Sequence, residues 1–304
     1  MAGTWLDVTI VGFDPATNLP VGDVIGLPQN LLAGMATARH ARLGLDDVGQ
    51  LEGVSLDDLR AVVAPQLETG ALAIGLVGDF DADAAIALVA GSLGALPSRP
   101  DRHEDAAVAI PVRFAGDRPI ITLNHAGAAD QGVLALSWAT DDSSDQRDDI
   151  TRSLLAAVFS LRLTEKLREE LGTTYSPDAN SFSQRRFDGF GHLTALATLP
   201  PQAMDAAAAA IRDIAAELVS QPVAIDLVER ARNPIREGFE RAETQNAAWT
   251  SMVAMAQSDP ALLDRRRARM AILMALTPAE LQAAARRYLA GTAPVEIRIV
   301  PKAR

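Results

Sequence analysis

The sequence predicts an α+β fold in which helices cover one face of a largely antiparallel sheet. Three observations lead to this prediction. Short alternating apolar stretches at near-hairpin spacing occupy the middle of the chain, a long and almost purely helical block follows them, and a strand-like stretch comes last. Strands that follow one another closely in the sequence, with the helices in separate blocks, are typical of an antiparallel sheet that has its helices on one side.

The region before residue 98 predicts a helix, a strand and a second helix. The first helix starts at Ser55, which forms a capping pair with Asp58. The strand is expected at Leu72–Val77, where apolar residues alternate with period two. A turn and an amphipathic helix are expected within Asp79–Leu96. Two prolines and five charges then interrupt the apolar pattern in 96–109, as a linker would.

The rest of the chain predicts the sheet and most of its helices. Strands are expected within 119–127, 131–140, 173–184, 187–199 and 295–301. A long helix, capped near Ser144 and running to Leu171, connects the second of these strands to the third. Its apolar residues recur every four positions, which predicts one buried stripe through Leu155, Phe159, Leu163, Leu167 and Leu171. Further helices are expected at 204–220, 223–242, 246–258, 260–275 and 277–289.

Two stretches of the chain match each other as copies of one helix-strand pattern. The stretch "SLDDLRAVVAPQLETGALAIGLVG" begins at Ser55, and "TPAELQAAARRYLAGTAPVEIRIVP" begins at Thr277, roughly 220 residues later. Each starts with a capping pair and ends in alternating apolar residues. We therefore predict one complete unit in residues 105–304 and the closing part of another in residues 1–98. Because any capped helix followed by a strand would align in this way, a coincidental match stays open.

Composition narrows the classes of partner. The chain has 39 acidic and 28 basic residues and a net charge of -11, which repels phosphate backbones and anionic lipid surfaces. Nucleic acid and membranes are therefore not expected as partners. No apolar run approaches the roughly 18 to 20 residues that a membrane span needs. The absence of Cys excludes disulfides and thiolate metal sites but leaves the compartment open between periplasm and cytoplasm.

One charged segment, "LTEKLREELGTTYSPDANS", is a candidate for a functional site. Arg168 falls in the last turn of the long helix, Gly172 suits a left-handed C-terminal cap, and Tyr175 begins the next strand. The guanidinium and the phenol are therefore expected to converge beside the helix end. Spacing alone favours a different interpretation, a solvated arginine in a last helical turn and a tyrosine that packs in a strand.

Two segments carry a resemblance to a known family. The stretch "LRLTEKLREELGTTYSP" resembles the helix-to-strand segment of the second domain in pitrilysin-like (insulinase-type) zinc metallopeptidases, whose pattern is L-R-E-x-x-G-x-x-Y-S. The stretch "LAIGLVGDFDADAAIALVAGSLGALPSR" is similar to the strand, G-D-F-D turn and helix that close each domain of that family. The resemblance covers residues 20–304 and implies the family's duplicated domain, one full unit plus the closing part of another. Thr173 and Thr174 depart from the apolar-small pair usual there.

The resemblance also defines what this chain lacks. Members that cut peptides hold zinc with H-x-x-E-H and a further Glu. No two of the four histidines here are four or five residues apart; they are His40, His103, His125 and His192. The resemblance therefore implies no metal and no cofactor in this chain, no peptidase activity of the chain alone, and Zn on a partner half.

For this half the resemblance implies an auxiliary role in catalysis. Arg168 matches the arginine that holds a peptide carbonyl, and Tyr175 matches the tyrosine whose hydroxyl steadies the oxyanion. The expected partners are a peptide substrate and a zinc-bearing catalytic half, either upstream on the same polypeptide or on a separate subunit. The edge of the sheet also offers a place where an extended peptide adds as a strand.

Two other functions are weighed against this one. A structural or assembly protein with the same fold and no peptidase role would resemble the core subunits of respiratory complexes, although it would have no need of Arg168 and Tyr175. A peptide-binding module acting alone would need a closed cavity, which one unit and the end of another are not expected to enclose.

Overall fold

The computed structural model describes residues 53–99 except 71 and 73, residue 118, and residues 120–302 except 126, 171–176, 184–187, 257 and 258. These residues divide into two compact lobes. The helical lobe contains the described residues between 53 and 99, together with 238–267. The sheet lobe contains those between 118 and 237, together with 268–302.

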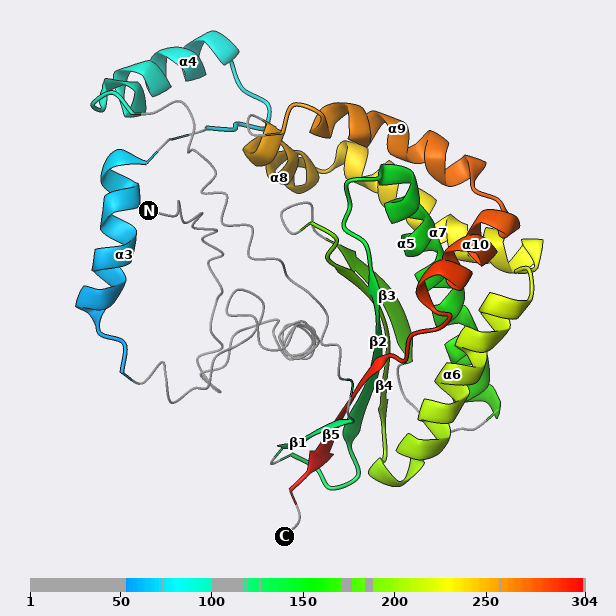
Figure 1. Cartoon of the computed structure of the whole chain (residues 1–304). Helices are drawn as coiled ribbons and strands as arrows, with labels where there is room; N and C mark the ends of the chain where they lie inside the picture. The colour runs from blue at the N-terminus through cyan, green and yellow to red at the C-terminus, as the bar shows by residue number, and fades with distance from the viewer. Residues whose placement is uncertain are drawn as a thin grey trace. The chain divides into compact units, whose positions relative to one another are not determined.

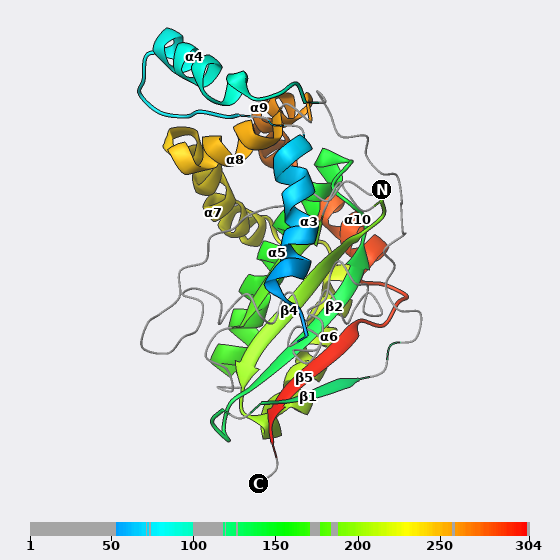
Figure 2. The same cartoon turned by 90° about the vertical axis from the view of Figure 1, so that its left-hand side faces the viewer.

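The sheet lobe is built on a mixed five-stranded sheet. Its strands are β1 (Ile121–His125), β2 (Gly132–Thr140), β3 (Asp178–Ser183), β4 (Gly191–Leu199) and β5 (Val295–Pro301). Their order across the sheet is β1-β5-β2-β4-β3, and Figure 2 shows β4, β2, β5 and β1 side by side. The β1–β5 pairing is parallel and the other three are antiparallel. The predicted α+β fold with a largely antiparallel sheet is confirmed.

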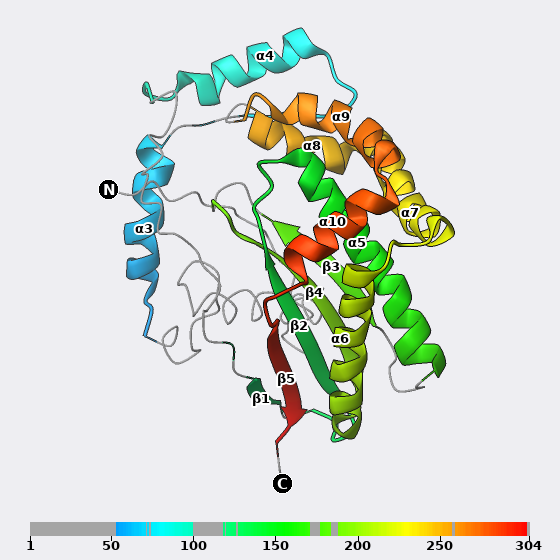
Figure 3. The same ribbon diagram turned by 45° about the vertical axis from the view of Figure 1, so that its right-hand side comes forward.

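Three helices of the sheet lobe lie on one face of the sheet, as predicted (Figures 1 and 3). They are α5 (Gln146–Leu163), α6 (Met204–Ser220) and α10 (Pro278–Tyr288), and each packs against strands of the sheet. The capping box of Thr277 and Glu280 starts α10. The remaining helical elements are η2 (Thr164–Glu170), η3 (Pro201–Ala203), α7 (Ile225–Thr244) and α9 (Leu262–Ala275), of which α7 and α9 continue into the helical lobe.

The central strands are apolar on both faces because both faces are buried. Toward the helices, Trp138 packs on Phe159 of α5 with ring centroids 5.8 Å apart. On the opposite face, Ala135, Val295 and Ile297 form a second cluster of buried side chains. When the side chains on both faces of a strand are buried, its sequence is almost continuously apolar, as in "GVLALSWAT" of β2.

The helical lobe contains α3 (Leu56–Thr69), α4 (Ala82–Gly91), the short η1 (Leu93–Ala95) and α8 (Asn246–Ala256). The predicted capping pair of α3 is confirmed, because the Ser55 amide donates to Asp58 Oδ2 at 2.9 Å and the Asp58 amide donates to Ser55 Oγ at 3.2 Å. The Ala84 amide donates to Asp81 Oδ1 at 2.8 Å, which starts α4. Among the described helices of both lobes, none has the length and apolar character that crossing a membrane requires.

The predicted strand at Leu72–Val77 is wrong. Its described residues have no regular secondary structure and pair with none of the five strands. A strand forms only where a neighbour takes its backbone hydrogen bonds, and no described strand lies beside this one. The segment instead packs on α8: a Cβ added at Gly75 would come within 2.5 Å of Val253 Cγ1. An alternating pattern of apolar residues is therefore not sufficient to predict a strand.

The long helix begins next to its predicted cap and changes from α- to π-helix before its predicted end. It begins after Asp145 rather than Ser144, because the Asp145 carboxylate accepts from the amides of Arg147 and Asp148. The α-helix ends at Leu163, and Thr164–Glu170 continues it as a π-helix. The predicted end, Leu171, lies outside the described residues.

Candidate functional site

The helix that carries Arg168 is anchored by the apolar stripe that the sequence predicted. Leu155, Phe159, Leu163 and Leu167 are all completely buried. The fifth member of the stripe, Leu171, lies outside the described residues. Since none of these side chains faces solvent, the stripe is part of the core, and any functional group must come from another side of the helix.

Arg168 lies in the π-helical segment η2 and not in an α-helical turn. A π-helix bonds each amide to the fifth residue before it, so its turn is wider and successive residues rotate less around the axis. The structure describes the backbone of Arg168 but not its side chain. Single turns of π-helix inside α-helices occur frequently at functional sites.

Ion pairs hold η2 against two further helices. Glu165 accepts from Arg162 at 3.0 Å and from Arg230 of α7 at 3.4 Å. Arg162 also binds both carboxylate oxygens of Glu217 in α6, at 3.0 and 2.8 Å. This hydrogen bonding to Glu217 raises the pKa of Arg162, so the guanidinium stays charged. The backbone on the N-terminal side of Arg168 is therefore tied to α5, α6 and α7 together.

Gly172 and Tyr175, which the sequence places after the helix, lie outside the described residues. The structure locates the two ends of the segment that contains them, the π-helix up to Glu170 and the edge strand β3 from Asp178. The predicted convergence of Arg168 and Tyr175 therefore stays a prediction.

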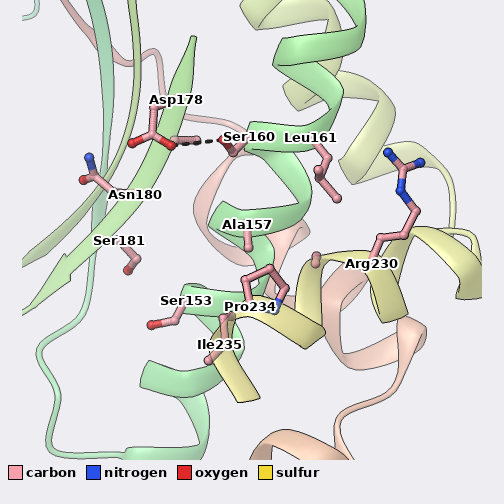
Figure 4. Close-up of a pocket in the computed structure, with 12 residues that line it drawn as sticks. Ser153, Ala157, Ser160, Leu161, Asp178, Asn180, Ser181, Arg230, Pro234 and Ile235 are labelled. Atoms are coloured by element: carbon pink, nitrogen blue, oxygen red, sulfur yellow. Dashed lines mark hydrogen bonds between the residues drawn. The ribbon is translucent and has the colours of Figure 1, made fainter. Parts of the chain in front are cut away.

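A cavity that the sequence did not predict lies within the sheet lobe (Figure 4). Its volume is about 390 Å³, and α5, β3 and α7 line it. A signal for the cavity was present in α5. The small residues Ser153, Ala157 and Ser160 recur at helical spacing, so one face of the helix carries only short side chains. Pro234 of α7 forms part of the opposite wall.

Two of the four histidines lie among the described residues, and both are engaged. The amide of Gly127 donates to Nδ1 of His125, and Nε2 of His125 donates to the Gln131 carbonyl at 2.8 Å. His192 Nδ1 lies 2.9 Å from Thr194 Oγ1, which in turn bonds Ser137 Oγ at 2.7 Å. In the part of the chain that the structure describes, no three acidic or histidine side chains form a group that fits a zinc ion. His40 and His103 lie outside that part.

His192 leads to a prediction about acid stability. Its side chain stacks on Phe182 and its residue is 4% exposed, and this burial lowers its pKa from 6.5 to about 4. The unfolded chain therefore binds a proton at His192 before the folded chain does. As the pH falls from 6.5 to 4, the free energy of unfolding is expected to fall by about 3 kcal/mol through this residue.

Urea unfolding at a series of pH values measures this contribution. The variant His192→Asn, which keeps a polar side chain without a titratable ring, is expected to show a flatter dependence between pH 6.5 and 4. An equal slope in both proteins would mean that His192 is not the group responsible. Glu280, whose pKa is lowered by its hydrogen bonds to Arg147 and Thr277, is common to both proteins and cancels in the comparison.

Comparison with known proteins places the chain in a family. The family model described as the peptidase M16 inactive domain matches residues 53–235, which is more than half of the chain. A search of the curated proteins finds no match.

Many solved structures resemble the chain, and three of them show the extent of the likeness. A conserved protein from Enterococcus faecalis V583 superposes with a TM-score of 0.73 at 16% identity, over 90% of this chain and 63% of that one. The peptidase M16 inactive domain from Pseudomonas fluorescens has a TM-score of 0.69 at 19% identity, over 90% and 64%. The periplasmic protease PqqL from Escherichia coli has a TM-score of 0.64 at 16% identity, over 93% and 31%.

The chain spans less than two thirds of each of these three proteins. At such identities the structural likeness shows the fold, and it agrees with the match to the family model over residues 53–235. The chain belongs to the M16 peptidase family, the pitrilysin-like metallopeptidases that its sequence resembles, and it carries the inactive domain of that family.

Proposed function

We propose that this chain is the non-catalytic C-terminal part of a zinc peptidase and supplies Arg168 and Tyr175 to a zinc site on another half. In this role Arg168 binds a carbonyl of the peptide substrate and Tyr175 donates its hydroxyl to the oxyanion on the scissile carbonyl. The zinc-bearing half is either an upstream part of the same polypeptide or a separate subunit.

The observation that carries the proposal is the place of Arg168 in the π-helical segment of an inactive M16 domain. π-Helical turns are rare in proteins and occur frequently at functional sites. The segment is held rigidly, since Leu163 and Leu167 are completely buried and Glu165 is paired with two arginines. Rigid support of this kind is what a group that positions substrate requires.

The proposed chemistry suits the two residue types. Negative charge develops on the carbonyl oxygen as water attacks the peptide bond, and a phenol directed at that oxygen stabilises the transition state more than the ground state. A guanidinium is always charged and offers several donors in one plane, so it suits a carbonyl of the bound backbone. Zinc on the other half would activate the attacking water.

The arrangement of units belongs to the same proposal: residues 1–98 close a first M16 unit and residues 105–304 form a second. Exposed apolar side chains in the helical lobe support it. Leu56, Leu76 and Leu88 are 71%, 51% and 72% exposed, and no residue of α4 is buried. Side chains of this kind are expected to be covered by the remainder of the first unit.

A zinc measurement tests the proposal that the zinc site lies on the other half and not in this chain. The isolated chain is expected to hold no stoichiometric zinc after dialysis and to leave unstructured peptides intact, because it has no H-x-x-E-H ligand set. Elemental analysis and a fluorogenic peptide assay provide the two readouts. Adding the zinc-bearing half should produce cleavage that exceeds the activity of that half alone.

The outcome separates the proposal from its rival. One tightly held zinc per chain would contradict the proposal that zinc binds only to the other half. Cleavage by the zinc-bearing half that is unaffected by this chain would favour a structural or assembly role for the same fold.

A further inference from the structure

We infer that the cavity between α5, β3 and α7 binds a basic side chain of an extended peptide that adds to the free edge of β3. The inference rests on the proposed function and extends it, because it gives the peptide substrate a chemical preference. All residues that line the cavity belong to the sheet lobe.

The lining of the cavity places it along the edge of the strand. Four consecutive residues of β3, Asp178 to Ser181, contribute to the lining. Because successive side chains of a strand point to opposite faces, a cavity on one face would touch only alternate residues. Within the described sheet β3 pairs only with β4, so its other edge presents unpaired backbone groups. A peptide that pairs with this edge passes the mouth of the cavity.

Two polar side chains of β3 contribute to the lining of the cavity. Asp178 is exposed at the start of the strand, and its Oδ1 accepts from Ser160 Oγ at 3.0 Å (Figure 4). The hydroxyl oxygen of Ser181 is buried and has no hydrogen-bond partner in the described structure. A buried polar atom without a partner costs stability, so its retention points to a ligand that completes it.

The polar groups that line the cavity suit a positively charged ligand group. Arg230 contributes the stem of its side chain, while its guanidinium points away from the cavity in Figure 4 and pairs with Glu165. The remaining polar groups are one carboxylate, the side-chain amide of Asn180 and serine hydroxyls, beside apolar residues that include Ala157 and Ile235. An aliphatic stem ending in an ammonium or guanidinium matches this combination. A net charge of -11 favours basic peptides at longer range as well.

The volume also agrees with such a ligand. About 390 Å³ lies at the lower end of the range of ligand-binding pockets. The cavity therefore has room for one long side chain and its hydration water, whereas a folded partner would have to bind elsewhere.

Fluorescence anisotropy with the chain alone tests the inference. One labelled probe is a peptide of alternating threonine and valine with a single central lysine, and the matched probe carries norleucine instead. The lysine peptide is expected to bind roughly 10- to 100-fold more tightly, as a charge-assisted hydrogen bond to a carboxylate would give. Equal binding of the two probes would overturn the inference.

Three variants locate the binding site. Asp178→Asn keeps an oxygen for Ser160 but loses the charge, and it is expected to abolish the preference for lysine. Ala157→Leu keeps a strong helix former but fills the cavity, and it is expected to abolish binding. Asp130→Asn makes the same charge change on an exposed turn between β1 and β2, and it should leave binding unchanged. If Asp130→Asn weakens binding as much as Asp178→Asn, the attraction is long-range and the cavity is not the site.

Ser181→Ala distinguishes a binding role from a structural one. Since the hydroxyl has no partner, its removal is expected to leave the melting temperature unchanged or slightly raised while it weakens lysine-peptide binding several-fold. A lower melting temperature with unchanged binding would show a structural role and contradict the inference. Because these measurements need no zinc-bearing half, a negative result leaves the roles of Arg168 and Tyr175 to be decided separately.

Discussion

Replacing Tyr175 by phenylalanine is expected to lower the rate of peptide cleavage by roughly 10- to 1,000-fold when the chain acts with its zinc-bearing half. The substitution removes one hydroxyl, and with it the hydrogen bond to the oxyanion that forms in the transition state. The ground-state complex loses little, so kcat should fall while KM stays nearly constant. Steady-state kinetics with a fluorogenic peptide measures both quantities.

The chain offers a matched control, since it contains only two tyrosines. Tyr288 donates its hydroxyl to Asp148 at 2.8 Å and to Asp141 at 3.1 Å, within the sheet lobe. Tyr288→Phe is the same chemical change at a structural position, so it is expected to reduce stability and to leave kcat unchanged. If Tyr175→Phe behaves like Tyr288→Phe, the oxyanion role is wrong.

Arg168→Ala should affect substrate binding as well as rate. A guanidinium that holds a backbone carbonyl acts on the bound substrate and on the transition state alike, so KM should rise. Arg267→Ala, at an exposed ion pair with Asp264 in α9, provides the control. Unchanged kinetics for both Arg168→Ala and Tyr175→Phe would mean that the pair is structural, and the assembly-protein alternative would then replace the proposal.

The largest loss of stability is expected from Arg152→Ala. The Arg152 side chain is completely buried and donates to the carbonyl oxygens of Asp141 at 2.6 Å and Asp142 at 2.8 Å. It also pairs with Asp148 at 3.1 Å and Asp149 at 3.2 Å. Its removal leaves the two carbonyls without their guanidinium donor and takes the buried cation away from the two carboxylates, which keep their hydrogen bonds to Tyr288 and Ser183 and the longer Arg287 pair. The free energy of unfolding is therefore expected to fall by about 3 to 5 kcal/mol.

The same network reaches α10 through Tyr288. The guanidinium of Arg152 lies 5.6 Å from the ring centroid of Tyr288, whose pKa is raised well above its ordinary value by burial and by the hydrogen bond to Asp148. Arg152 therefore joins the loop after β2, the start of α5 and the end of α10. A lysine has one charged nitrogen in place of the planar fork, so Arg152→Lys should restore only part of the loss.

Urea unfolding monitored by circular dichroism measures the effect. Arg267→Ala serves again as the control, and its exposed pair is expected to contribute less than about 1 kcal/mol. A comparable small loss for Arg152→Ala would show that water replaces the guanidinium at these carbonyls and that the buried network contributes little.

Periodicity and capping chemistry in the sequence determined most of the elements of this protein. The apolar repeat of α5, the capping box of α10 and the alternating residues of β5 were each predicted because their signals are local. A helix keeps its hydrogen bonds within itself, so a pattern over a few turns is enough to identify it. The L-R-E-x-x-G-x-x-Y-S motif pointed to the family in the same local way.

The tertiary structure decided what depends on distant partners. Leu72–Val77 has the alternation of a strand but no described neighbour to take its hydrogen bonds, so it forms none. The change from α- to π-helix at Thr164 was not predicted, and the ion pairs of Arg162 and Glu165 around it reach α6 and α7, which are distant in the sequence. The cavity beside β3 exists because three separate elements meet around small residues of α5. Pairing and cavities are properties of distant residues brought together, and a sequence pattern that reports on neighbours within a few positions does not contain them.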